Sequence, residues 1–316
     1  MATDSDQVRG MLWVWAIIVL IVSVCPGNAA DTLRIGTLPV VDTLPLLVGQ
    51  AEDLFAEQGL RVELTPFQSA LERDAALQSG KLDGYFGDLL NTILLIRSGQ
   101  KLKIVTTAFH THPRHRMFGI ATAPGSGAMS PADLKGRQVA ISRATIIEYL
   151  LDRIMAAEGF GPDHVAKLEI KKIPVRLQML LADQVPAALL PEPLLTLAES
   201  KGAHVVADDR RLDTSETILA LDAGRISGDA TLASRFLTAY RQAVDRINRD
   251  PEAYKTLLVE RTRFPLPVQK RFRVPVFPDP QPPSPEDVAA VQDWLQQNGL
   301  IETRLVYDSV VWTDQP

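Results

Sequence analysis

Seven residues of the chain, HTHPRHR at 110–116, hold three of its five histidines together with two arginines. Imidazole nitrogens could bind a metal ion, and guanidinium groups could bind a phosphate. A metal site would use His110 and His112, which lie on the same side of an extended segment, plus carboxylates from elsewhere. Two other interpretations stay open: a solvated polar connection, and a segment in which His110 or Thr111 contacts a ligand.

Arrangements for covalent or metal catalysis are not recognisable in the sequence. It contains no Ser–His–Asp order, no G-x-S-x-G elbow, no glycine-rich phosphate loop and no zinc spacing. Cys25 is the only cysteine and precedes the expected mature start, so the mature chain has no thiolate nucleophile and no disulfide. Asp42 and Asp88 could act as an acid–base pair, but nothing in the sequence marks a raised pKa. We therefore predict no catalytic residue, no cofactor and no metal.

Residues 1–30 differ in composition from the rest of the chain. MLWVWAIIVLIVSV (11–24) is apolar and shorter than a spanning helix, and the small residues of CPGNAA follow it. This pattern is typical of a signal peptide, here cleaved after Ala29 or Ala30. The alternatives are an uncleaved membrane anchor and lipid attachment at Cys25, which the preceding valine disfavours.

The expected mature chain is mildly acidic. Without Arg9, Asp4 and Asp6, the totals of 33 basic and 38 acidic residues fall to 32 and 36, a net charge of −4. This balance argues against broad nucleic-acid binding.

Short apolar runs alternate with helical patterns from Asp31 onward. The expected strands are TLRIGTL (32–38), LRVELTPF (60–67), KLDGYFG (81–87), KLKIVTTAF (101–109), MFGIATA (117–123), RQVAIS (137–142), KLEIKKI (167–173), VPAALL (185–190) and AHVVAD (203–208). The expected helices are 44–59, 70–80, 88–99, 144–159, 176–183, 192–202, 228–250, 251–261 and 284–299. Strands joined by helices predict right-handed crossovers and largely parallel sheets covered on both faces.

Two serine–proline pairs predict helix starts. Ser130 and Ser284 are expected N-caps, each followed by proline at the first helical position, and Asp133 is expected to reach back to Ser130. The proline-rich segment FPDPQPPSP (277–285) is expected to connect elements.

Four phrases of the sequence resemble the periplasmic substrate-binding proteins of ABC importers. They are LRIGTLPVVDTLPLLVGQAEDLFAEQGLRVELTPF (33–67), AALQSGKLDGYFGDLLNTILLIRSG (75–99), SPADLKGRQVAIS (130–142) and VPAALLPEPLLTLAESKGAHVVADD (185–209). Their order is similar to that in the type II group that handles nitrate, aliphatic sulfonates and thiamine precursors. The resemblance implies an α/β fold with two lobes arranged as a clamshell, each a small, mostly parallel sheet flanked by helices.

The resemblance also implies how the chain divides. Lobe 1 takes residues 31–118 and 212–316, and lobe 2 takes 119–211, after the signal peptide at 1–30. The ligand lies in the cleft between the lobes, and closure of the hinge traps it.

Loops at the carboxyl ends of the strands should line this cleft, because helix N-termini there present unpaired N–H groups. The candidate ligand-binding residues are Thr37, Leu38, Asp42, Thr43, Asp88, His110, Ser142, Arg143, Thr145 and Glu192. Asp42, Thr43 and Asp88 could instead cap the helices that follow them. Glu192 could accept a hydrogen bond from an amine or complement the dipole of its helix.

Three acidic groups and one arginine among these candidates favour a neutral, zwitterionic or amine-bearing solute over a purely anionic one. We predict a monomeric, non-catalytic receptor in the periplasm that delivers a small solute to the transmembrane subunits of an ABC permease. Two alternatives are a periplasmic enzyme on the same fold and a ligand-sensing lobe for a membrane receptor.

Overall fold

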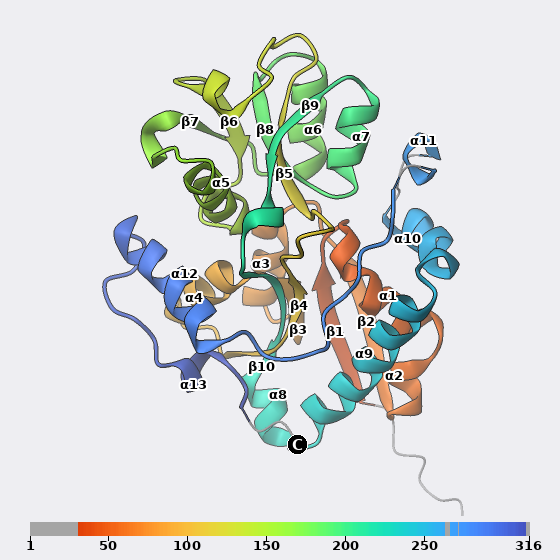
Figure 1. Ribbon diagram of the computed structural model, residues 1–316. Helices are drawn as coiled ribbons and strands as arrows, with labels where there is room; N and C mark the ends of the chain where they lie inside the picture. Colours follow the sequence, from red (N-terminus) through yellow and green to blue (C-terminus); the bar gives the residue numbers. More distant parts are fainter. Residues whose placement is uncertain (1–30, 263–265, 271, 314–316) are drawn as a thin grey trace, which may run out of the picture.

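Two five-stranded sheets organise the part of the chain that the computed structural model describes, residues 31–262, 266–270 and 272–313 (Figure 1). The strand orders are β2-β1-β3-β10-β4 and β7-β6-β8-β5-β9. The expected signal peptide, with Cys25, lies outside the described residues. No helix among the described residues is long and apolar enough to cross a membrane.

The first sheet takes its strands from both ends of the described chain. They are β1 (Asp31–Thr37), β2 (Leu60–Pro66), β3 (Gly84–Gly87), β4 (Leu102–His110) and β10 (Ser215–Asp222). β1 pairs in parallel with β2 and β3, whereas β10 runs antiparallel between β3 and β4. Among these described strands, β10 alone is reversed.

The second sheet is built from one continuous segment. Its strands are β5 (Phe118–Thr122), β6 (Gln138–Ile141), β7 (Ala166–Glu169), β8 (Ala187–Pro191) and β9 (His204–Asp208). β6 pairs in parallel with β7 and β8, and β5 runs antiparallel between β8 and β9. The predicted fold class is confirmed: each half is a small sheet with one reversed strand among those described.

Helices cover both sheets (Figure 1). Around the first lie α1 (Leu44–Ala51), α2 (Leu54–Glu57), α3 (Ala70–Gln78), α4 (Leu89–Arg97), α8 (Ala223–Gly228), α9 (Leu232–Arg249), α10 (Lys255–Thr262), α12 (Pro285–Gln297) and α13 (Tyr307–Val310). Around the second lie α5 (Ile146–Ala157), α6 (Ile173–Leu181), α7 (Leu194–Ser200) and the short α11 (Leu266–Gln269). The helix expected over 44–59 is broken between α1 and α2, where Asp53 has a φ of 57°.

Helix packing in the first half follows the apolar face of α9. Phe236 of α9 stacks on Phe55 of α2, with ring centroids 5.2 Å apart, and α9 also packs against α1. Burial of such an apolar face supplies most of the stability of a surface helix.

Both predicted serine caps are present. Ser284 and Asp287 form a capping box at the start of α12, where Ser284 Oγ accepts from the Asp287 N–H at 3.0 Å. Ser130 and Asp133 form the same arrangement on a single 3-10 turn, Pro131–Leu134. The predicted local starts are therefore confirmed, because each depends only on neighbouring residues.

We expected no strand or helix over the segment that forms β10. All residues of β10 except the last are buried, so the strand shows no alternation of apolar and polar residues. A strand buried on both faces does not alternate in sequence, and three register shifts against β4 disturb its pairing further.

Two short segments, 111–117 and 209–214, connect the sheets, and they lie side by side (Figure 1). The Thr111 N–H donates to the Thr214 carbonyl at 3.0 Å, and the Thr214 N–H donates to Thr111 Oγ1 at 3.0 Å. The strands of the two sheets separate at these segments, while the lobe boundaries at 118 and 212 stay a prediction.

Candidate functional site

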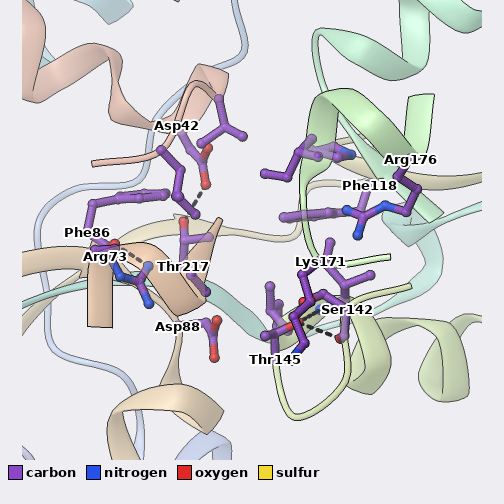
Figure 2. A pocket seen from close by; sticks show the side chains of 18 residues that line it. Asp42, Arg73, Phe86, Asp88, Phe118, Ser142, Thr145, Lys171, Arg176 and Thr217 are labelled. Atoms are coloured by element: carbon purple, nitrogen blue, oxygen red, sulfur yellow. Dashed lines mark hydrogen bonds between the residues drawn. The ribbon is translucent and has the colours of Figure 1, made fainter. Parts of the chain in front are cut away.

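A cavity lies between the two sheets (Figure 2). The first half contributes Leu38, Val40, Asp42, Ala70, Arg73, Phe86, Gly87, Asp88 and Thr217, and the second contributes Phe118, Ser142, Thr145, Ile146, Ile147, Lys171, Ile173, Arg176 and Pro191. Many of these residues follow the carboxyl ends of β1, β3, β6, β7 and β8, where ligands of α/β proteins collect. Apolar walls dominate, and a few polar groups converge between them.

Arg176, in the first turns of α6, is the cavity-lining side chain with the most donor atoms that lack a hydrogen-bond partner among the described residues. Its side chain is fully buried, and Nη1 donates to the Ile170 carbonyl at 3.0 Å. Nε and Nη2 have no partner among the described residues. Burial lowers the pKa of Arg176 to about 10, so the guanidinium is still charged at neutral pH. A buried cation with two free donors is costly unless an anion or water meets it.

Arg73 of α3 is just as buried but fully occupied. Its guanidinium donates to the Phe86 carbonyl at 2.7 Å, to Asn91 Oδ1 at 2.7 Å and to Asp74 Oδ1 at 2.8 Å. It also lies 4.4 Å from the centre of the Tyr85 ring. These contacts tie α3 to β3 and α4, so Arg73 shapes the cavity wall rather than offering donors to a ligand.

Asp42 lies on the opposite side of the cavity from Arg176 (Figure 2). It belongs to the 3-10 turn Val41–Thr43 after β1, and Thr217 Oγ1 of β10 donates to its Oδ2 at 2.7 Å. Oδ1 has no partner among the described residues. Burial raises the pKa of Asp42 to about 6, against the hydrogen bond from Thr217.

Asp88 and Thr145 face each other as helix caps from the two halves. Asp88 Oδ1 accepts from the Asn91 N–H at 2.7 Å and caps α4, as predicted. Thr145 Oγ1 accepts from the Ile147 N–H at 3.2 Å and caps α5, and Ser142 accepts from that hydroxyl through its carbonyl. Burial raises the pKa of Asp88 to about 6, although the N–H groups of Asn91 and Ile146 favour its charged form.

Leu38, Asp42, Asp88, Ser142 and Thr145 are thus the predicted candidates that line the cavity.

Thr37 and Thr43 are buried beside the cavity without lining it. Thr43 Oγ1 donates to the Val40 carbonyl at 2.7 Å, and Thr37 Oγ1 reaches the Thr65 carbonyl at 3.5 Å. Neither Thr43 nor Asp42 caps α1 through its side chain.

Arg143 and Glu192 also lie outside the cavity lining. Arg143 is half exposed and contacts Glu148 Oε1 at 3.3 Å. The Glu192 carboxylate is buried, accepts from Arg116 Nε at 2.9 Å and accepts from the Thr196 N–H of α7 at 3.0 Å. The Glu192 side chain therefore caps α7 and pairs with an arginine.

The histidine-rich segment forms the first connection between the sheets. His110 ends β4 outside the cavity lining, with Nε2 3.5 Å from Asp213 of the second connection. The rings of His112 and His115 lie against each other, with centroids 5.0 Å apart. Burial lowers the pKa of His115, and His112 and Arg114 lower it further. No group of three metal-ligating side chains occurs among the described residues.

A buried carboxyl pair joins the two connections. Asp209 Oδ2 accepts from the N–H groups of Met117 and Phe118 at 2.8 and 2.7 Å. Burial raises the pKa of Asp209 to about 7 and that of Glu216, which its carboxyl group contacts, well above the usual range. Burial therefore favours the neutral form of both carboxyl groups.

The two halves also touch at the edge of the cavity, through residues that line it or flank its lining. These contacts are Lys172 Nζ to Glu72 Oε1 at 3.0 Å, the Ile173 N–H to the Gln68 carbonyl at 3.4 Å, and the Val41 N–H to the Glu192 carbonyl at 3.4 Å. The structure therefore describes a state in which the halves meet around the cavity.

Sequence reasoning did not select Arg73, Lys171, Arg176 or Thr217. The strand expected over 167–173 ends at Glu169, so the loop that carries Lys171 and precedes Arg176 was hidden inside it. If the strand had been expected to end at Glu169, this loop would have been expected at the cleft, because loops that follow the carboxyl ends of strands line it. We expected no purely anionic solute because Arg143 was the only arginine among the candidate residues. That reason was wrong, because Arg176 lines the cavity instead of Arg143.

Comparisons with known proteins agree with this geometry. Residues 41–254 match the family described as NMT1/THI5 like. The alkanesulfonate-binding protein SsuA from Xanthomonas axonopodis pv. citri, bound to MOPS, is similar in structure (TM-score 0.76, 20% identity, 89% of this chain and 98% of that chain covered). So is the zinc-bound ligand-binding component of an ABC-type import system from Staphylococcus aureus (TM-score 0.75, 18% identity, 89% and 96% covered).

The desulfurization enzyme DSZB has a similar structure as well (TM-score 0.64, 16% identity, 90% of this chain and 97% of that chain covered). None of the curated proteins compared by sequence matches the chain. At these identities, the structural likenesses establish the fold that this chain shares with periplasmic binding proteins.

Proposed function

The chain belongs to the NMT1/THI5-like family, and on that premise we propose that it is the solute-binding receptor of an ABC importer. It captures a small solute in the cavity between the two sheets, closes around it and delivers it to the permease subunits. The likeness to an alkanesulfonate-binding protein and to a component of an ABC-type import system supports this assignment. Capture and closure form one equilibrium, because a ligand that contacts both halves favours the closed state.

One observation carries the proposal: the free edge of the Arg176 guanidinium in a cavity lined from both halves. Nε–H and one N–H of Nη2 point the same way, so this edge matches two oxygens of a carboxylate, sulfonate or phosphate. The solute therefore carries an oxyanion, and its body lies against the apolar walls of the cavity.

The remaining parts of the proposal concern the whole chain. The lobes are residues 31–118 with 212–316, and 119–211, and they hinge on the connections 111–117 and 209–214. Residues 1–30 direct export to the periplasm, where the receptor acts as a monomer and without catalysis.

A periplasmic enzyme on the same fold is the second candidate. Two observations favour it: a desulfurization enzyme shares the fold, and Asp42 and Asp88 have pKa values of about 6, suited to proton transfer. A receptor returns its ligand unchanged after prolonged incubation, whereas an enzyme depletes it, and mass spectrometry of the incubated ligand distinguishes the two. A ligand-sensing role would share the receptor's binding behaviour but act on a membrane receptor instead of a permease.

The test of the proposed function is ligand binding with and without Arg176. Native mass spectrometry of the purified protein identifies any co-purified solute, and calorimetry against small sulfonates, carboxylates and phosphates measures affinity. Arg176→Gln should weaken binding of the responding anion by about 100-fold, because two charge-assisted hydrogen bonds are lost. Arg143→Gln removes the same charge outside the cavity and should leave affinity unchanged.

Two outcomes would contradict the proposed function. One is the absence of binding to every oxyanion in the panel together with a purified protein free of solute. The other is equal affinity in wild type and Arg176→Gln, which would place the ligand elsewhere.

A further inference from the structure

Asp42 is not explained by the architecture of its own half. It does not cap α1, it forms no ion pair among the described residues, and its side chain is 1% exposed. One carboxylate oxygen is bonded to Thr217 and the other has no partner among the described residues. A buried carboxylate with a free oxygen costs stability unless a cationic or N–H donor meets it.

Among the described residues, no cation pairs with this carboxylate. Burial is the main influence on the pKa of Asp42, and no cation among the described residues contributes to it. The Asp42 charge also raises the pKa values of Glu216 and Tyr240, so its surroundings are acidic rather than basic. A positive group at this place must therefore come from the bound molecule.

Arg176, on the other half, is a buried cation that lacks an anionic partner among the described residues. Burial alone perturbs its pKa, so no carboxylate among the described residues is close enough to pair with it. Asp42 and Arg176 therefore do not neutralise each other, although both line the same cavity (Figure 2). The space between them is bounded by apolar side chains that include Leu38, Phe86 and Phe118.

On the basis of the proposed function, we propose that the solute is a zwitterion whose oxyanion binds Arg176 and whose ammonium group binds Asp42, with a short apolar body between them. Each end satisfies a buried group that the protein leaves unpaired. Because the two groups belong to different halves, such a molecule bridges the cavity and favours the closed arrangement. An anion that lacks the amine can pair with Arg176 but leaves Asp42 unpaired.

Calorimetry compares the affinities of matched probes. Aminopropanesulfonate is compared with propanesulfonate, which lacks the amine, and with propylamine, which lacks the sulfonate. Aminobutanoate and butanoate form the corresponding carboxylate pair. Wild type should bind the better amino acid or amino sulfonate about tenfold or more tightly than its amine-free partner. Asp42→Asn keeps the size of the side chain and a hydrogen bond to Thr217, and it should reduce that ratio to near one. Asp163→Asn, on the single turn Pro162–His164, removes a charge outside the cavity and should preserve the ratio.

The outcomes separate this inference from the proposed function. Tight binding of the amine-free anions, dependent on Arg176 but with an unchanged ratio in Asp42→Asn, would overturn the zwitterion while leaving the receptor intact. Loss of the ratio in Asp88→Asn but not in Asp42→Asn would also overturn it, because the amine would then bind the other carboxylate. The ratio of the affinities for the amine-bearing probe and its amine-free partner is measured within each variant. Thermal melting confirms that each variant is folded.

Discussion

Arg73 and Arg176 show how the partners of a buried side chain decide its use. Both guanidinium groups are fully buried at one cavity, yet Arg73 donates to a carbonyl, an amide and a carboxylate, whereas Arg176 keeps one edge free. The difference cannot be inferred from residue type, because both are arginines in helices. An unpaired buried group that lines a cavity therefore indicates where a ligand binds.

The buried carboxyl groups predict an unusual dependence of stability on pH. Burial raises the pKa values of Asp42 and Asp88 to about 6 and of Asp209 to about 7, and it raises that of Glu216 further. The unfolded chain loses these protons near pH 4, so ligand-free stability falls as the pH rises from about 5 to about 8. Thermal melting across this range checks the direction.

Glu216→Gln provides the matched test of this dependence. The variant keeps the size of the side chain and removes the charge, so it should stabilise the protein at about pH 8 by on the order of 2 kcal/mol and change little at about pH 5. Glu63→Gln, on the half-exposed strand β2, should leave the profile unchanged. A Glu216→Gln protein that melts below wild type at about pH 8 would contradict the assignment.

Helix starts position the cavity groups at the element scale. Asp88, Thr145 and Glu192 begin α4, α5 and α7 through their side chains, and the capping box of Ser284 and Asp287 begins α12. Asp287 also accepts from the N–H and hydroxyl of Ser215 on β10, which joins α12 to the middle of the first sheet. Asp287 thus takes part both in the cap of α12 and in the packing of α12 against β10.

Ser284→Ala should lower the free energy of unfolding by about 1 kcal/mol, because the Asp287 N–H loses its acceptor. Chemical denaturation measures the change. Ser227→Ala, which removes an exposed hydroxyl bonded within α8, serves as the control and should have a smaller effect. Equal losses in the two variants would mean that the box adds no stability to α12.

Chain connections and side-chain contacts join the two halves of the molecule. The connections 111–117 and 209–214 form the hinge that we propose, and the contacts around Glu72 and Lys172 lie beside the cavity. In addition, Trp294 of α12, which packs against α4, donates to Asp152 of α5 at 2.9 Å. Closure therefore depends on contacts that only the folded molecule brings together.

Glu72→Ala should weaken ligand binding about two- to fivefold, because it removes an exposed ion pair between the halves and favours the open arrangement. Calorimetry at low and high salt measures the change, which should shrink as salt screens the pair. Glu63→Ala removes a similar exposed pair within one sheet and should leave affinity unchanged. An affinity in Glu72→Ala equal to that of wild type would show that this pair does not favour closure.

Most elements and their kind follow from signals in the sequence, with β10 as an exception. Apolar periodicity, the caps at Ser130, Ser284 and Asp88, and four family-like phrases predicted two α/β halves with a ligand at the strand ends, because these signals are local in the chain. Which polar groups lack partners follows from the fold and not from local sequence. Pairing depends on contacts between distant residues: Glu192 meets Arg116, Asp42 meets Thr217 of an unpredicted strand, and Arg176 meets no anion among the described residues.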